Sequence, residues 1–202
     1  MSFAQSFDLR FFSEQASGQK EFLQENNLNT YKIFYQQFFL TDNKLDIKKL
    51  DALLKKSYPN QNSGGMLVLD WEGKGMDVLT KQNNTKEFDF YVAQFKSALK
   101  YVKDLRPNIQ VGFYALPFRQ YWNINKSYYS KNEKLMSILS MQDFIAPSLY
   151  IFYPTDRYKS SNKEYVAKNV SFALQIGEKL GKPVYPFIWQ RVHPSNRQDG
   201  NR

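Results

Sequence analysis

The chain has 202 residues, 42% of them hydrophobic, which suffices for one sizeable core but not for two, so we expect a single domain over residues 1–202. It contains no Cys and a single His, which excludes disulfides, thiolate metal sites and a Cys nucleophile, and we expect neither a metal nor a cofactor. The net charge of +9 attracts polyanions in general, but the Lys residues are spread along the chain as on an ordinary solvated surface, and we expect no nucleic-acid partner.

Strand and helix patterns alternate along the chain from about residue 31. Short apolar or aromatic runs bounded by turn residues predict strands at 31–40, 66–71, 111–116, 144–152 and 184–189. Apolar residues at helical spacing predict helices at 44–56, 88–102, 131–141 and 166–180. We expect Asp42 or Asn43 to cap the first of these helices, and Arg106-Pro107 to end the second.

This alternation is typical of the α/β class with parallel strands joined by helical crossovers. A Rossmann-type sheet should show a Gly-rich phosphate turn after a strand, and the turn at Ser63-Gly64-Gly65 instead precedes a strand. The pattern therefore favours a (β/α) TIM-type barrel. Because such a barrel usually needs about 250 residues, we expect one that is incomplete or truncated at the C-terminus.

Asp70 and Glu72 are the candidate catalytic pair. Residues two apart on a strand point to the same face, so both carboxylates should leave the run 66–71 side by side, at the mouth where barrel enzymes keep their active sites. Two neighbouring carboxylates disfavour each other's second charge, which leaves a proton for general acid catalysis near neutral pH. Because Asp-x-Glu is a common spacing, a capping or salt-bridged pair at a strand end is an equally acceptable interpretation.

Four ordered pieces of the chain resemble the hyaluronidase family of glycoside hydrolases over about residues 60–195. They are GGMLVLDWEG, then FKSALKYVKDLRP running into VGFYALPF, then FIAPSLYIFYP, then GKPVYPFIWQRVH. The resemblance implies a glycosidase on a (β/α) barrel that cleaves N-acetylhexosamine-containing glycans, with the substrate's own acetamido oxygen as nucleophile. An acidic glycosaminoglycan is among the candidate substrates.

The resemblance also assigns roles to individual residues. Glu72 matches the acid/base, Asp70 the carboxylate that orients the acetamido group, and Tyr150 the tyrosine that steadies the acetamido oxygen. Tyr114 and Trp189 match rings that line the substrate groove, although isolated aromatic residues are more often part of a core. His193 is expected to be a hydrogen-bonded loop residue rather than a catalytic base.

The family further implies an extracellular or secreted protein, and since the first residues lack the features of a signal peptide, the signal is not expected within this chain. No stretch of about 18 apolar residues is present, so we expect no membrane span. We expect a monomer. Three alternatives remain open: a non-catalytic carbohydrate-binding or remnant domain of the same fold, a muramidase of another barrel family, and a basic polyanion-binding protein.

Overall fold

The computed structural model describes residues 11–12, 18–25, 30–189 and 192–193. These residues contain six strands: β1 (Phe11–Phe12), β2 (Thr30–Tyr35), β3 (Leu40–Thr41), β4 (Lys44–Leu45), β5 (Gly65–Asp70) and β6 (Ile109–Phe113). The α-helices are α1 (Gln19–Glu25), α2 (Ile47–Ser57), α3 (Gly73–Lys81), α4 (Thr85–Leu105), α5 (Lys126–Glu133), α6 (Met136–Leu139) and α7 (Thr155–Leu180), and a short 3₁₀ turn, η1, covers Gln36–Phe38. The predicted alternation of strands and helices is confirmed.

The main sheet is parallel, with the order β1-β2-β5-β6. Two extended segments continue this row in chain order, since Tyr114 forms a parallel bridge with Ala146, and Ser148 forms one with Phe187. The described residues therefore form an open row of parallel segments, and no closed barrel is found among them. The prediction of a parallel (β/α) arrangement is confirmed, and the fold is a barrel-type row without closure in the described part of the chain.

The last two predicted strands, 144–152 and 184–189, are wrong as regular strands and form only isolated bridges. Backbone hydrogen bonds still join them: Ile145 N–H donates to the Pro183 carbonyl at 2.9 Å, and Phe187 N–H donates to the Pro147 carbonyl at 2.8 Å. Because proline has no N–H, Pro147 interrupts the ladder that this parallel pairing would otherwise complete.

Alternation along β5 separates two apolar clusters. Leu67 and Leu69 belong to the large core between the sheet and the helices, whereas Met66 and Val68 belong to a smaller cluster with Phe144 and Ala146, which come from the strand row itself. The first face is therefore covered by helices, and the second is the concave interior of the barrel-type row.

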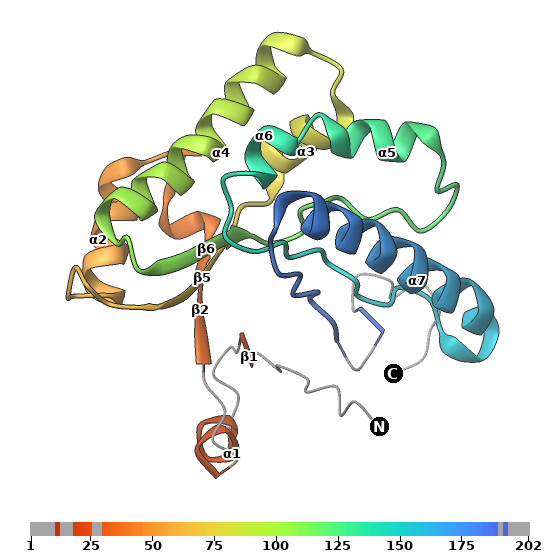
Figure 1. Cartoon of the computed structure of the whole chain (residues 1–202), viewed down its shortest axis with the longest axis horizontal. Coiled ribbons are helices and arrows are strands. Elements are labelled where there is room, and N and C mark those ends of the chain that lie inside the picture. The colour runs from red at the N-terminus through yellow and green to blue at the C-terminus, as the bar shows by residue number, and fades with distance from the viewer. Residues whose placement is uncertain (1–10, 13–17, 26–29, 190–191, 194–202) are drawn as a thin grey trace.

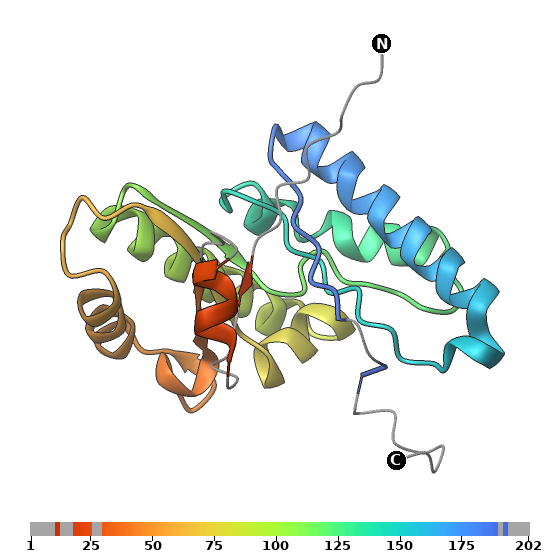
Figure 2. The same ribbon diagram turned by 90° about the horizontal axis from the view of Figure 1, so that it is seen from below.

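The helices lie along the outer side of the row, and α2, α4, α6 and α7 follow one another across the picture in an arc (Figure 1). Seen from below, α2 and α7 lie toward opposite ends of the molecule (Figure 2). The helix predicted at 88–102 is confirmed as part of α4, which has a buried apolar stripe formed by Tyr91, Phe95, Ala98, Leu99 and Val102. Among the described residues, no helix has both the length and the apolar character needed to cross a membrane.

Several boundaries differ from the sequence-based expectation. The strand 31–40 ends at Tyr35, where η1 begins. Helix α2 is capped by Asp46, whose carboxylate accepts a hydrogen bond from Lys49 N–H at 3.1 Å, whereas Asp42 and Asn43 adopt positive φ in the turn between β3 and β4. The predicted helix 131–141 is divided between α5 and α6.

The sequence does not predict helix α3, because Gly73 and Gly75 lower the helix propensity of residues 73–81. The close packing of its first turn explains it. A Cβ at Gly75 would lie 2.7 Å from Nε1 of Trp71, so only glycine allows α3 to approach the buried indole this closely.

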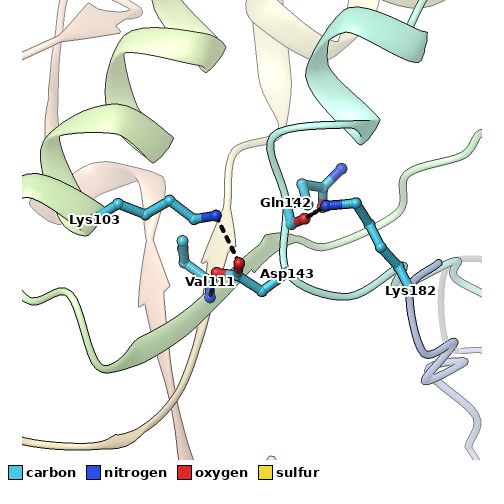
Figure 3. Close-up of polar contacts among 5 residues, drawn as sticks. All are labelled: Lys103, Val111, Gln142, Asp143 and Lys182. Carbon is cyan, nitrogen blue, oxygen red and sulfur yellow. Dashed lines mark hydrogen bonds and ion pairs between the residues drawn. The ribbon is translucent and has the colours of Figure 1, made fainter. Parts of the chain in front are cut away.

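Side chains as well as backbone atoms fasten β6 to the next segment of the row. Val111 N–H donates to the Asp143 carboxylate at 2.9 Å, and Lys103 Nζ lies 2.6 Å from the other oxygen of that carboxylate (Figure 3). Phe113 N–H likewise donates to the side-chain oxygen of Gln142 at 2.6 Å, and Lys182 Nζ donates to the Gln142 carbonyl. These contacts replace part of the strand ladder and position the residues that follow β6.

Candidate active site

The two candidate carboxylates flank a residue that fixes their direction. Trp71 is fully buried on the helix-covered side and stacks on Phe95 with 4.3 Å between ring centroids. Because Met66, Val68 and Asp70 alternate with Leu67, Leu69 and Trp71, Asp70 belongs to the concave face. Glu72 follows as the exposed N-cap residue of α3. The strand therefore delivers both carboxylates at its C-terminal end.

A residue in the left-handed backbone conformation follows shortly after each of the strands β5 and β6. Gly73, directly after Glu72, has φ of +62°, and Ala115, directly after Tyr114, has φ of +63°. Glycine adopts this conformation freely, but alanine does so at a cost of about 1–2 kcal/mol. Such outliers concentrate where the surrounding fold must hold a functional side chain in place.

Three of the predicted residues share one aromatic cluster. The rings of Tyr114 and Tyr150 lie 6.0 Å apart, and the Tyr150 and Trp189 rings lie 5.8 Å apart. Phe187 packs edge-on against Tyr114 at 5.1 Å. Trp189 keeps 41% of its surface exposed, so this cluster has one face toward solvent.

The hydroxyls of this cluster remain protonated. Burial raises the pKa of Tyr150, and the neighbouring Tyr114 and the charge of Asp70 raise it further. Burial also raises the pKa of Tyr114, where the charge of Glu72 adds to the shift while the hydrogen bond to Ser148 and the charge of Arg119 oppose it. The two tyrosines are therefore hydrogen-bond donors at neutral pH, and both predicted carboxylates lie close enough to act on them electrostatically.

A cation that sequence reasoning did not select lies in the same cluster. Arg119 donates through Nη1 to the Ser148 hydroxyl and, at 3.3 Å, to the Ser148 carbonyl. Its guanidinium lies 4.4 Å from the centre of the Phe152 ring, and the Ser148 hydroxyl lies 2.9 Å from that of Tyr114. Arg119 follows the strand end by several residues, so no spacing rule could have indicated it.

Tyr35 and His193 were also not selected as site residues. Tyr35 ends β2 in register with Asp70, at the same edge of the sheet. His193 stacks on the Tyr150 ring at 5.4 Å and its backbone N–H donates to the Ile151 carbonyl at 2.7 Å, which agrees with the predicted hydrogen-bonded loop residue. Burial lowers the pKa of its imidazole, with the charge of Arg119 in the same direction and that of Glu72 opposing.

Within the described part of the chain, no group of three or more His, Asp and Glu side chains could hold a metal ion. The site instead offers two carboxylates, tyrosine hydroxyls and one guanidinium around a partly exposed ring cluster. This combination suits the binding of a polar ring and the protonation of its leaving group.

Comparisons with known proteins place the fold. No protein-family model and no curated protein matches the chain. Among solved structures, a monoclinic crystal form of bee venom hyaluronidase matches with a TM-score of 0.66 and 16% identity, over 86% of this chain and 75% of that one. Bee venom hyaluronidase in complex with a hyaluronic acid tetramer matches with a TM-score of 0.62 and 15% identity, over the same shares.

The chain has the fold of a hyaluronidase. The resemblance expected from the sequence is thus confirmed at the level of fold. In this hyaluronidase-type fold, Asp70 and Glu72 stand at the carboxyl end of a parallel strand, where barrel enzymes place their chemistry.

Proposed function

We propose that the protein is a hyaluronidase-like glycoside hydrolase that cleaves N-acetylhexosamine-containing glycans. The observation that carries the proposal is the position of Asp70 on the concave face at the end of β5, with Glu72 two residues later and the protonated Tyr150 hydroxyl within reach of the Asp70 charge. The hyaluronidase-type fold supports this assignment.

The proposed reaction is substrate-assisted hydrolysis with retention of configuration. Glu72 protonates the glycosidic oxygen while the acetamido oxygen of the substrate attacks the anomeric carbon, so that the glycosidic bond breaks as the cyclic intermediate forms. The Asp70 carboxylate accepts a hydrogen bond from the N–H of the acetamido group and so orients that group. Tyr150 donates a hydrogen bond to the acetamido oxygen. Glu72 then removes a proton from the water that opens the intermediate.

The proposed substrate is a glycan, with an acidic glycosaminoglycan as the first candidate. Three observations support this choice: the net charge of +9, the guanidinium of Arg119 beside Tyr114, and the hyaluronic acid tetramer bound in one matching structure. Tyr114 and Trp189 are proposed to line the groove. An extracellular location belongs to the same proposal, because the matching structures are of a venom enzyme.

The direct test is hydrolysis of hyaluronan, chondroitin, chitin oligosaccharides and peptidoglycan by the wild-type chain, Glu72→Gln and Glu178→Gln. Glu178 is an exposed residue of α7 outside the ring cluster, so its variant controls for the loss of one surface carboxylate. We expect one glycan to be cleaved, with the rate lowered about 10²- to 10⁴-fold by Glu72→Gln and unchanged by Glu178→Gln. This loss corresponds to about 3 kcal/mol or more of transition-state stabilisation.

The panel also separates the alternatives. Cleavage of peptidoglycan alone would favour the muramidase. Binding of a glycan without cleavage, unaffected by Glu72→Gln, would favour a non-catalytic carbohydrate-binding domain. Equal cleavage by wild type and Glu72→Gln would overturn the proposed role of Glu72.

A further inference from the structure

A second aromatic cluster, built from Tyr121, Trp122 and Tyr153, lies beyond the candidate active site. Its indole is fixed although 48% of it is exposed: Trp122 Nε1 donates to the Tyr153 hydroxyl at 3.2 Å, and the Tyr121 and Tyr153 rings lie 4.5 and 5.6 Å from it. An exposed ring held in one orientation loses little entropy when a flat apolar surface is laid on it.

This indole forms one wall of a pocket of about 260 Å³. The loop after β6 contributes Tyr121, Trp122 and Asn123, and α7 contributes Ser161, Glu164 and Lys168. Sites for drug-sized ligands span about 300–1,000 Å³, so this pocket suits a single sugar ring. One aromatic wall faced by hydroxyl, amide and charged groups matches a pyranose, which has an apolar C–H face and a rim of hydroxyls.

The charges of the pocket cancel. Lys168 Nζ lies 2.5 Å from the Glu164 carboxylate, one helical turn away, so the pocket carries a paired cation and anion. A phosphate or carboxylate group would be repelled by Glu164 and would have to compete for Lys168. An uncharged sugar ring therefore fits better than a nucleotide or a uronic acid.

A ring stack and several hydrogen bonds connect the second cluster to the candidate active site. The Tyr121 ring stacks on Tyr165 at 4.9 Å, and the Tyr165 hydroxyl donates to the carbonyls of Ser148 and Tyr150, both at 3.4 Å. The buried Asn162 accepts from the Tyr121 hydroxyl at 2.6 Å and donates to the Tyr153 carbonyl at 3.0 Å. Two successive rings, those of Tyr121 and Tyr165, thus connect Trp122 to the backbone of Tyr150.

We propose that the Trp122 pocket is a distal saccharide subsite, which binds an uncharged N-acetylhexosamine ring of a long glycan whose scissile bond lies at Glu72. This inference rests on the proposed glycosidase function. It explains why an exposed indole is fixed in place near the site, and it predicts that chain length of the glycan contributes to affinity.

The test uses hyaluronan tetrasaccharide and decasaccharide, with affinities measured by calorimetry in a Glu72→Gln background so that the ligand is not consumed. We expect the decasaccharide to bind roughly tenfold more tightly than the tetrasaccharide, and Trp122→Ala to remove this difference while leaving tetrasaccharide affinity unchanged. Trp122→Phe should retain most of the difference. Phe90→Ala, an exposed aromatic residue on α4, is the matched control and should retain all of it.

Three results would overturn the inference: equal affinity for both lengths, a length preference that survives Trp122→Ala, or no measurable binding of either oligosaccharide. These outcomes are distinct from failure of the proposed function. If the wild-type chain cleaves no glycan but the length preference depends on Trp122, the subsite stands and the catalytic assignment falls; if cleavage depends on Glu72 but not on Trp122 at any length, only the subsite falls.

Discussion

The imidazole of His193 stacks on the phenol ring of Tyr150, with 5.4 Å between centroids and an angle of 13° between the planes. Trp189 meets the same imidazole edge-on at 5.7 Å. Because His193 is the only histidine in the chain, its titration reports on this cluster without any need for assignment.

The pKa of His193 should lie below its ordinary value of 6.5, because burial and the charge of Arg119 disfavour the imidazolium. As the pH falls below 6.5, the His193 imidazole therefore takes up a proton in the unfolded chain before it does so in the folded chain. The unfolding free energy should therefore fall from pH 6.5 down to the lowered pKa, and this component should vanish in His193→Gln. NMR titration of the imidazole C–H signal measures the pKa, and denaturant unfolding at several pH values measures the stability.

Two variants test whether Glu72 and Arg119 lie where they affect His193. Glu72→Gln removes a charge that raises the His193 pKa, so that pKa should fall further, whereas Arg119→Gln should raise it. Unchanged titration in both variants would contradict the electrostatic arrangement of the site, independently of any activity.

Asp70→Asn should reduce cleavage nearly as much as Glu72→Gln, because the acetamido group loses the carboxylate that orients its N–H during attack. The expected loss is about 10²-fold or more in kcat, measured on the glycan that the wild-type chain cleaves. Full activity of Asp70→Asn beside an inactive Glu72→Gln would rule out the substrate-assisted mechanism and leave a simple acid/base role for Glu72.

Arg119→Gln should weaken the cleavage of acidic glycans more than that of neutral ones. A guanidinium beside the Tyr114 hydroxyl attracts a uronate carboxylate, and this attraction has no counterpart on chitin. We expect kcat/KM for hyaluronan to fall about tenfold or more, as for a lost charge-assisted hydrogen bond, with chitin oligosaccharides affected less. An equal loss on both substrates would indicate that Arg119 only supports Ser148 and Tyr114.

Asp143→Ala should destabilise the fold, because it removes the acceptor of the Val111 N–H and the partner of Lys103. An unsatisfied buried donor costs about 1–3 kcal/mol. Asp104→Ala provides the control, since Asp104 pairs with Lys100 on the exposed face of α4 and such pairs contribute at most about 1 kcal/mol. Urea unfolding of both variants measures the difference, and equal losses would show that the contact in Figure 3 does not fasten β6.

The sequence predicted those elements whose apolar pattern is continuous. The stripe on α4 and the run of β5 are both buried in the structure, and the direction of Asp70 follows from strand alternation alone. Helix α3 escaped prediction because the reason for it is tertiary: Gly75 disfavours a helix locally but allows contact with Trp71.

The candidate site was predictable only where it follows strand ends. Tyr114, Tyr150 and Trp189, which the family resemblance selected, meet in one ring cluster, and Tyr114 and Trp189 were expected at strand ends. Arg119 belongs to a loop without regular spacing, so its contact with Ser148 depends on how that loop folds back. The prediction of regular strands at 144–152 and 184–189 was wrong for a local reason that is visible in the sequence. Each run contains a proline, and a proline within a run weakens strand pairing.

Pro186 has a consequence for the edge of the last described segment that faces away from residues 145–147. Tyr185 and Phe187 donate their N–H groups inward to the Ile145 and Pro147 carbonyls, which turns the backbone of residue 186 toward the opposite edge. That edge offers no donor at Pro186, so any strand that adds to the row there meets a gap in its ladder. An edge with such a gap is a poor template for indiscriminate pairing with other chains.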